Sequence, residues 1–460
     1  MEDSILSRET LKLDAELVNT FREQNLPGMS VGIVDDQRLV WSKGYGWADI
    51  QRQLKADEKS IYHIASVAKM FNATMLMQLR DAGKLCLDDP IVRYLPEFKL
   101  KSRFIDPREP TFRQVVAHAA GLPMDYGFDM SVPGEWRQFP VATILADLST
   151  IDLAQPAFLH IHYSNLGICL MGQALQRIAD LPYREYVKSH IFQPLGMKNT
   201  AWTLTDEMAA SLAIGYERQI GDRPRETSAL WVTGDFGPPA GGVHSSVEDM
   251  AKFIALQFRE GTANGAQILG STTLREMRAP IFLADDWSMA YGIGWELERL
   301  ANHAVVGHGG GGLGFVAEIK LVPDLRFGIV ILINQVTDQH AIARQAVLSL
   351  IPAFEEIREK QRPTSRRLLP AEVQDYLGWY SGALGYSVRI QLRGDKLSMV
   401  AVDKDGGRGS EWVLAPAEAG SFIIESGSDV YDGERISFRR NNENGVMQLQ
   451  WQRFLLDKTT

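Results

Sequence analysis

The segment Tyr62-His63-Ile64-Ala65-Ser66-Val67-Ala68-Lys69 sets a serine and a lysine three residues apart, directly after an apolar approach. The apolar spacing that follows predicts a buried helix from Ser66 to about Ala82, and Gly83 is a natural helix stop. Because residues i and i+3 of a helix share a face, Lys69 is expected to point where Ser66 points. A serine hydroxyl attacks a carbonyl readily only when a neighbour takes its proton, and a partly desolvated lysine can do so near neutral pH. The segment therefore predicts a nucleophilic serine with a lysine beside it.

The second motif is Tyr163-Ser164-Asn165, which offers a phenol and an amide. The phenol can relay a proton, and the amide can hold a substrate carbonyl or orient the lysine. Each motif also has a simpler interpretation. Roughly one or two Ser-x-x-Lys matches arise by chance in a chain of this size, and a helix cap with a solvent-exposed lysine gives the same pattern. A loop tyrosine followed by a turn asparagine explains the second motif equally well in isolation.

The third motif is His308-Gly309-Gly310-Gly311, which leads into a predicted strand that starts at Phe315. Glycines let a substrate backbone lie against a strand edge, and a free backbone N–H there can donate to an oxyanion. Gly309, Gly311 and Gly314 also fit the pattern G-x-G-x-x-G. A dinucleotide site requires a helix after that pattern, whereas this chain has a strand, so the motif does not predict one.

Other candidate chemistries find little support. His160-Ile161-His162 could present two metal ligands from one face of a strand, but no cysteine or carboxylate cluster in the sequence completes a site. Cys86 and Cys169 are expected to be small buried apolar residues. No Gly-x-Ser-x-Gly occurs, so the nucleophile elbow of α/β-hydrolases is not supported. We expect no metal and no organic cofactor.

The composition limits the class of protein. The chain has 460 residues and a formal net charge of −9, which argues against nucleic acid as a partner. Its first residues have no basic start followed by an apolar run, so no secretory signal is predicted. No stretch approaches 18 uninterrupted apolar residues, so no membrane span is predicted. A cytoplasmic location is the resulting expectation.

The order of predicted elements indicates a sheet domain with a helical insertion, followed by a second β domain. Residues 1–355 form the first domain, and its mainly helical insert covers about 86–200. A charged stretch ending in Pro363 predicts a linker at 356–370, and short alternating strands predict a small antiparallel barrel at 371–460. Helices at both ends of the first domain are expected to pack on one sheet face. The individual predictions are a helix at 9–25, strands at 29–34 and 39–44, a hairpin of 315–321 with 327–333, and a helix at about 338–357.

Taken in order, Ser-x-x-Lys, Tyr-x-Asn and a basic residue followed by glycine resemble the serine β-lactamase and penicillin-binding superfamily. Two supporting segments are similar to that family as well: His118-Ala119-Ala120-Gly121-Leu122-Pro123 and Gly241 to Met250, which reads Gly-Gly-Val-His-Ser-Ser-Val-Glu-Asp-Met. The resemblance covers about residues 10–355. It implies an α+β fold in which a helical layer packs on an antiparallel sheet, with the site between the two.

The resemblance also implies roles for single residues. Ser66 becomes the acylated nucleophile, and Lys69 and Tyr163 become the base and proton relay. Asn165, together with His308 and the glycines after it, Gly309 and Gly310, would contact or orient the substrate. The backbone N–H groups of Ser66 and Gly311 would form the oxyanion hole.

His308 departs from the Lys-Thr-Gly that many β-lactamases and transpeptidases carry, and a histidine is mostly neutral at pH 7. His-x-Gly is similar to the branch that holds D-aminopeptidases, D-amino-acid amidases and some esterases. Several of those proteins also carry a small lipocalin-like β-barrel after the catalytic domain. The expected function is therefore a serine hydrolase that acts through an acyl-enzyme on a small amide, peptide or ester, D-amino-acid peptides included.

Three other functions stay open at this point. Acyl transfer would use the same acyl-enzyme, β-lactamase activity would use the same residues, and a non-catalytic sensor or scaffold would keep only the fold. The barrel could cover the site or drive assembly into a homo-oligomer, and the sequence does not choose between these.

Overall fold

We describe a computed structural model of the chain, which divides into two compact units, Met1–Arg358 and Glu359–Thr460. The structure describes residues 2–361 except 106–107, 130–134, 218–224, 227–229, 233 and 260. It also describes residues 373–459 except 383–386, 394–395, 403–407, 419, 426–430, 432, 441–446 and 452–453. Each unit is described by itself.

The first unit is built on a nine-stranded sheet in which every strand pairs antiparallel to its neighbours. The early strand β1 pairs with the late strand β18, Met29 opposite Ile333, so the two ends of the unit meet in mid-sheet. The predicted hairpin β17–β18 is buried along its whole length, as expected for strands covered on both faces. In sheet order the strands are β13 (Phe282–Leu283), β14 (Ala290–Tyr291), β15 (Glu296–Leu300), β16 (His303–Gly312), β17 (Phe315–Val322), β18 (Phe327–Ile333), β1 (Gly28–Asp35), β2 (Arg38–Asp49) and β3 (Leu54–Lys55).

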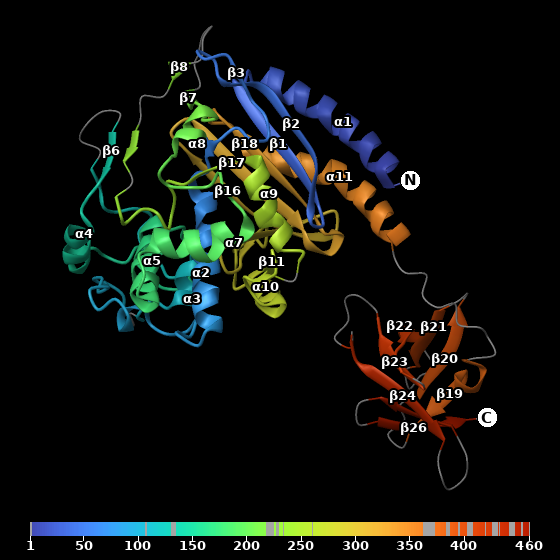
Figure 1. The fold of residues 1–460 in the computed structure, drawn as a ribbon. Helices are drawn as coiled ribbons and strands as arrows, with labels where there is room; N and C mark the ends of the chain where they lie inside the picture. Colours follow the sequence, from blue (N-terminus) through green and yellow to red (C-terminus); the bar gives the residue numbers. More distant parts are fainter. Residues whose placement is uncertain are drawn as a thin grey trace. The chain divides into compact units, whose positions relative to one another are not determined.

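Two long helices from the two ends of the unit cover one face of this sheet, α1 (Glu2–Glu23) and α11 (Gln339–Gln361) (Figure 1). Their apolar sides form one core with the strands beneath; for example, the rings of Phe327 and Phe354 stack at 4.2 Å. This confirms that the terminal helices pack together on one face. Helix α1 starts earlier than predicted, because Ile5 also packs into this core, and helix α11 ends later, because its charged last residues continue the helix into solvent.

The other face of the sheet carries the helical layer (Figure 1). The largest hydrophobic core of the first unit lies between this layer and the sheet. The predicted α+β architecture is therefore confirmed. The helices are α2 (Lys69–Asp81), α3 (Phe112–Val116), α4 (Val141–Asp147), α5 (Asn165–Ala179), α6 (Tyr183–Val187), α7 (Gln193–Leu195), α8 (Asp206–Ala210), α9 (Val247–Leu256) and α10 (Ser271–Met277), with short 3-10 or π turns at Ala65–Ala68, Ile91–Arg93, Leu148–Thr150 and Lys188–Phe192.

Short strand pairs interrupt the helical layer. The pair nearest the first motif is β4 (Tyr62–His63) with β10 (His244–Ser245). The rest are β5 (Phe128–Asp129), β6 (Glu135–Gln138) and β9 (Leu230–Val232), then β7 (Tyr216–Glu217) with β8 (Arg225–Glu226), and β11 (Thr262–Ala263) with β12 (Ala266–Gln267).

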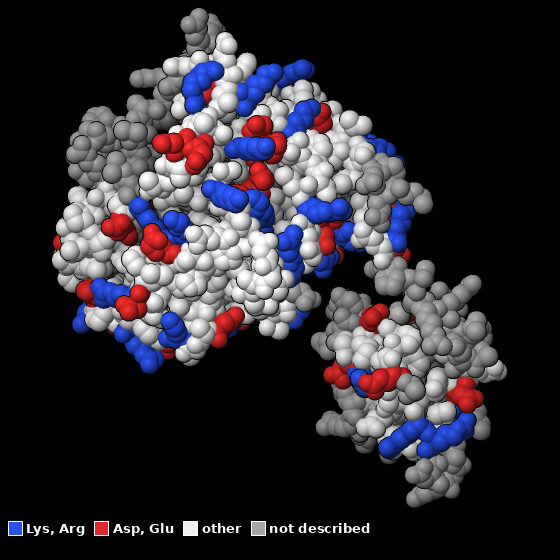
Figure 2. Space-filling model, in the orientation of Figure 1, with Lys and Arg blue, Asp and Glu red and all other residues white. Residues whose placement is uncertain are grey.

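The second unit is a closed antiparallel barrel, as predicted, and side chains such as Tyr380, Met399 and Leu449 fill its interior. The strands are β19 (Gly378–Ser381), β20 (Ser387–Arg393), β21 (Lys396–Val402), β22 (Arg408–Pro416), β23 (Ser421–Ile424), β24 (Arg435–Arg440), β25 (Met447–Trp451) and β26 (Phe454–Thr459). On the face that Figure 2 presents, acidic and basic side chains are interspersed over both units.

Three predictions need correction or limitation. Residues 356–361 of the predicted linker belong to helix α11, because its charged residues form the exposed last turns, and residues 362–370 lie outside the described residues. Cys86 is exposed, since it lies in the turn after α2, whereas Cys169 is buried as expected. Ser66 lies in a 3-10 turn, and the α-helix begins only at Lys69.

Across the described residues, none of the helices combines the length and the apolar character that crossing a bilayer requires.

Candidate active site

The segment that leads into the Ser66 turn is held by backbone pairing in the small two-stranded sheet of β4 and β10. Tyr62 and His63 pair with β10, and the Ile64 N–H donates to the Val243 carbonyl at 3.0 Å. Ala65 then adopts a left-handed conformation, φ 46°, which is uncommon for a residue with a side chain. This kink turns the chain from strand into helix and leaves the Ser66 hydroxyl at the start of α2.

Lys69 is brought to the serine as the spacing predicted. Its Nζ donates to the Ser66 Oγ at 2.9 Å and to the Ala240 carbonyl at 2.9 Å. Only 2% of Lys69 is exposed. Burial lowers the pKa of Lys69 to about 7, against weaker opposing effects of Cys169, Asp125 and Glu296. A lysine in this state is able to accept a proton near neutral pH.

Tyr163 reaches the same serine from the segment before α5. It forms a hydrogen bond with Ser66, and the Lys69 Nζ lies 4.9 Å from the centre of its ring. Burial raises the pKa of Tyr163, and the hydrogen bond with Ser66 opposes that effect. The phenol is therefore protonated at neutral pH and can pass a proton only while it accepts another.

Asn165 begins α5, and Ser164 caps that helix by accepting the Gly167 N–H at 2.9 Å. The Asn165 amide donates to the carboxylate of Asp125 at 2.8 Å. Asp125 is exposed, and it was not predicted from the sequence. Its position just after the His-x-x-Gly-Leu-Pro segment is the only sequence feature that could have drawn attention to it.

The glycines of the third motif lie against the serine turn. A Cβ added to Gly310 would come within 2.4 Å of the Ile64 carbonyl oxygen and 2.8 Å of the Ser66 amide nitrogen, so only glycine fits there. Strand β15 pairs with β16 only as far as Gly307, and β17 pairs with the rest of β16 up to Gly312. The Gly310–Gly311 backbone is thus adjacent to Ser66 at an edge that β15 leaves uncovered.

His308 occupies the strand position just before these glycines and is 1% exposed. Its Nδ1–H donates to the Gly309 carbonyl at 2.6 Å. Burial lowers the pKa of His308, against an opposing effect of Glu296. The ring is therefore neutral at pH 7, and no fixed positive charge stands at this place.

The remaining histidine motif does not join the site as a metal pair. The His160 Nδ1 lies 2.6 Å from the Asp285 Oδ2, in a segment without strand structure. Two ligands on one face of a strand were the premise of that interpretation, and this local conformation removes it.

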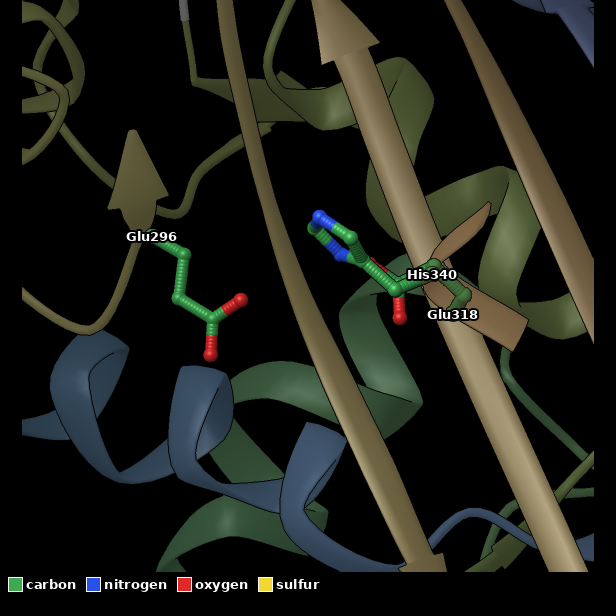
Figure 3. A group of neighbouring side chains, drawn as sticks. All are labelled: Glu296, Glu318 and His340. Atoms are coloured by element: carbon green, nitrogen blue, oxygen red, sulfur yellow. The ribbon is translucent and has the colours of Figure 1, made fainter. Parts of the chain in front are cut away.

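A different group, Glu296, Glu318 and His340, has ligand atoms within 4.8 Å of one another. Figure 3 shows the carboxylate of Glu296 directed toward the other two residues. The Lys320 Nζ lies 3.4 Å from the Glu318 carboxylate, so an ammonium already supplies the positive charge that an ion would bring. We therefore describe Glu318 as part of an ion-pair network with Lys320 and His340.

Comparison with known proteins agrees with this geometry. A family model described as β-lactamase matches residues 13–351. β-Lactamase-like protein 2 of Dictyostelium discoideum is 29% identical over 378 residues, which cover 77% of this chain and 65% of that protein. Protein flp of Staphylococcus aureus (strain MW2) is 27% identical over 328 residues, which cover 70% of this chain and 62% of that protein. The chain thus matches less than two thirds of the length of these relatives.

Two solved structures share the fold. The octameric penicillin-binding protein homologue from Pyrococcus abyssi aligns over 98% of this chain and 100% of its own, with a TM-score of 0.64 and 22% identity. A class C β-lactamase from Rhodobacter sphaeroides aligns over 74% of this chain and 98% of its own, with a TM-score of 0.61 and 23% identity. The family match over most of the chain establishes that this protein belongs to the β-lactamase family, with the fold of serine β-lactamases and penicillin-binding-protein homologues.

Proposed function

We propose that this protein is a serine hydrolase that works through an acyl-enzyme on Ser66. The observation that carries the proposal is the 2.9 Å contact between the Lys69 Nζ and the Ser66 Oγ, made by a lysine whose pKa is about 7. Neutral Lys69 would take the hydroxyl proton while the oxygen attacks a carbonyl carbon. Tyr163, which is hydrogen-bonded to the same hydroxyl, would carry that proton to the departing amine or alcohol.

The tetrahedral oxygen needs donors that are already in place. The backbone N–H groups of Ser66 and Gly311 are the candidates, because the close approach at Gly310 brings the two backbones together. Such donors are worth about 10²- to 10³-fold in rate. Water would then attack the ester, with the same lysine and tyrosine moving protons in the reverse direction.

The charges around the site favour neutral or amine-bearing substrates over carboxylates. His308 is neutral where many relatives carry lysine, and the carboxylates of Asp125 and Glu296 both act on Lys69 and Tyr163. A substrate carboxylate placed here would meet like charge without a fixed cation to hold it. We therefore propose an amide, peptide or ester substrate, and we rank β-lactam hydrolysis below these.

Apolar side chains flank the Tyr163–Asn165 segment and suit an apolar acyl group. Met124 is 54% exposed, and its carbonyl accepts the Asn165 N–H at 2.7 Å. Phe158 is 45% exposed, and its ring lies tilted against the ring of Phe282, with 5.6 Å between the ring centres. If the acyl part of a bound substrate covers these exposed groups, their burial stabilises the complex.

The test compares wild type with Ser66→Ala on p-nitrophenyl esters of several chain lengths, D- and L-amino-acid p-nitroanilides and nitrocefin. Turnover is followed together with the mass of the intact protein. We expect turnover and a transient Ser66 adduct in wild type, both absent in Ser66→Ala, with nitrocefin the poorest substrate. Equal turnover by both proteins would refute the assignment. A stable adduct without product release would favour a sensor.

Acyl transfer is the second candidate, because an apolar surface beside the acyl-enzyme can also hold an acceptor in place of water. Product analysis with and without an added amine or alcohol separates the two: a transfer enzyme gives the new amide or ester at the expense of the acid. We also propose assembly into a homo-oligomer, since the Pyrococcus abyssi homologue is described as octameric. Light scattering of the purified chain tests this directly.

A further inference from the structure

His118 has an unusual backbone conformation for a buried residue. It follows helix α3 with a φ of 54°, a region that residues with side chains rarely adopt, and it is 3% exposed. A conformation of this kind persists only where the surrounding contacts hold it. Several contacts of His118 are made with Tyr163 and with the residues on either side of it.

Two hydrogen bonds join His118 to the residues on either side of Tyr163. The His162 N–H donates to the His118 carbonyl at 2.8 Å, and the Ser164 N–H donates to the His118 Nδ1 at 3.2 Å. The backbone and the ring of one histidine therefore hold the chain immediately before and immediately after the tyrosine.

The rings are in contact as well. The His118 and Tyr163 ring centres are 4.2 Å apart, with 31° between the ring planes. From another side the Tyr291 ring meets His118 edge-on at 4.9 Å, and the Tyr291 hydroxyl donates to the Glu296 carboxylate at 3.2 Å. The chain of contacts Glu296–Tyr291–His118–Tyr163 thus runs from strand β15 to the phenol beside Ser66.

The arrangement requires a neutral imidazole. Because Nδ1 accepts the Ser164 N–H, the single ring proton of a neutral His118 lies on Nε2. Protonating Nδ1 would remove that acceptor. Burial lowers the pKa of His118 well below its ordinary value, and the nearby Lys69 adds to this. The hydrogen bond therefore persists throughout the pH range in which Lys69 titrates.

We propose that His118 is a positioning residue, which fixes the Tyr163 ring beside Ser66 and Lys69 without touching the substrate. This inference rests on the proposed serine hydrolase function. If His118 is changed, the phenol gains freedom, so proton transfer from Ser66 and to the leaving group slows. Substrate contacts made elsewhere remain. The expected effect is a loss in kcat with little change in KM.

Two variants separate the two parts of the contact. His118→Asn keeps a side-chain acceptor and tolerates the left-handed backbone but loses the ring. His118→Phe keeps a ring for stacking but loses the acceptor. The matched control is His190→Asn: His190 also stacks on a tyrosine, Tyr186, at 4.1 Å, but it is an exposed residue away from the motifs.

We expect each His118 variant to lower kcat about 10- to 100-fold on the best ester or amide, which is part of the roughly 10²- to 10⁴-fold that proton transfer contributes. KM should stay within about twofold, and His190→Asn should match wild type. In a Tyr163→Phe background, His118→Asn should cause no further loss, because the group it positions is already gone. This last comparison separates positioning of Tyr163 from a general loss of folded protein, because a general loss would lower the activity of both backgrounds by the same factor.

The proposed function and this inference fail in different ways. If a fluorophosphonate probe does not label Ser66 in wild type, the serine hydrolase assignment falls, and His118 loses its role with it. If wild type is labelled and both His118 variants keep a wild-type kcat, only the positioning role is overturned. Equal further losses from His118→Asn with and without the Tyr163 hydroxyl would also overturn it.

Discussion

Replacing Lys69 by methionine should abolish turnover and, below about pH 7, stabilise the folded protein. A lysine with its ordinary pKa of 10.5 is neutral in roughly one molecule in 3,000 at pH 7. With its pKa at about 7, half of the Lys69 side chains are neutral at that pH. The fold thus supplies about a thousandfold more base than an exposed lysine would. Lys69→Met removes that base, so we expect a loss of about 10³-fold in kcat/KM.

The same lowering of the Lys69 pKa also determines how the unfolding free energy of the variant differs from that of wild type. Because the folded pKa lies below the unfolded one, the unfolded chain binds more protons between about pH 7 and 10.5. Burying the lysine therefore costs about 5 kcal/mol at pH 7 and below, and this cost falls to zero as the pH rises toward 10.5. The two hydrogen bonds of Lys69 offset about 1 kcal/mol each. Lys69→Met should then be more stable than wild type by about 3 kcal/mol at pH 6.

Urea unfolding of both proteins at several pH values between 6 and 10 measures this difference, and other titrating groups cancel in the comparison. We expect the advantage of the variant to shrink steadily above pH 7 and to reverse at about pH 9, where the burial cost falls below the contribution of the two hydrogen bonds. A difference that stays constant across the range would show that Lys69 does not titrate near 7 in the folded state. The proposed base would then have to be another group.

Three other outcomes test the site. Gly310→Ala should lower kcat/KM at least about 100-fold, because its methyl group would press on the Ser66 amide. Ester hydrolysis measures kcat/KM, and circular dichroism checks that the variant is folded. His308→Lys should raise nitrocefin turnover relative to that of an amino-acid anilide, since it adds a fixed cation; an unchanged ratio would count against charge selection. Asp125→Asn removes a carboxylate that raises the pKa of Lys69, so the acid limb of the pH–rate profile should move to lower pH.

Local spacing was sufficient to predict the pairing of Ser66 with Lys69. Three residues of helical or 3-10 chain place both side chains on one side, so the error in the helix start did not separate them. The strands β17 and β18 were predictable because their unbroken apolar runs match burial on both faces. In both cases the physical cause acts within a few residues of sequence.

Contacts between distant segments could not be predicted in this way. The left-handed conformation of Ala65 leaves no mark in its residue type, and it follows a strand, β4, whose partner β10 lies about 180 residues later in the sequence. Asp125 and Glu296 gain their influence on Lys69 only when a loop of the helical layer and a strand of the sheet come together. The exposure of Cys86 could not be predicted either, because cysteine is usually buried and its residue type does not show that it lies in an exposed loop.

Strand β16 has a buried carboxylate on one face and the backbone of the Ser66 turn on the other, and glycines allow both to come close. On one face, a Cβ on Gly309 would lie 2.7 Å from the Glu318 carboxylate, so glycine leaves room for a buried charge paired with Lys320. At the next residue, Gly310, the backbone itself must approach the Ser66 turn. A side chain at either position would push the strand away from one of its neighbours. Adjacent glycines in strand β16 therefore meet two separate packing demands, one on each face of the strand.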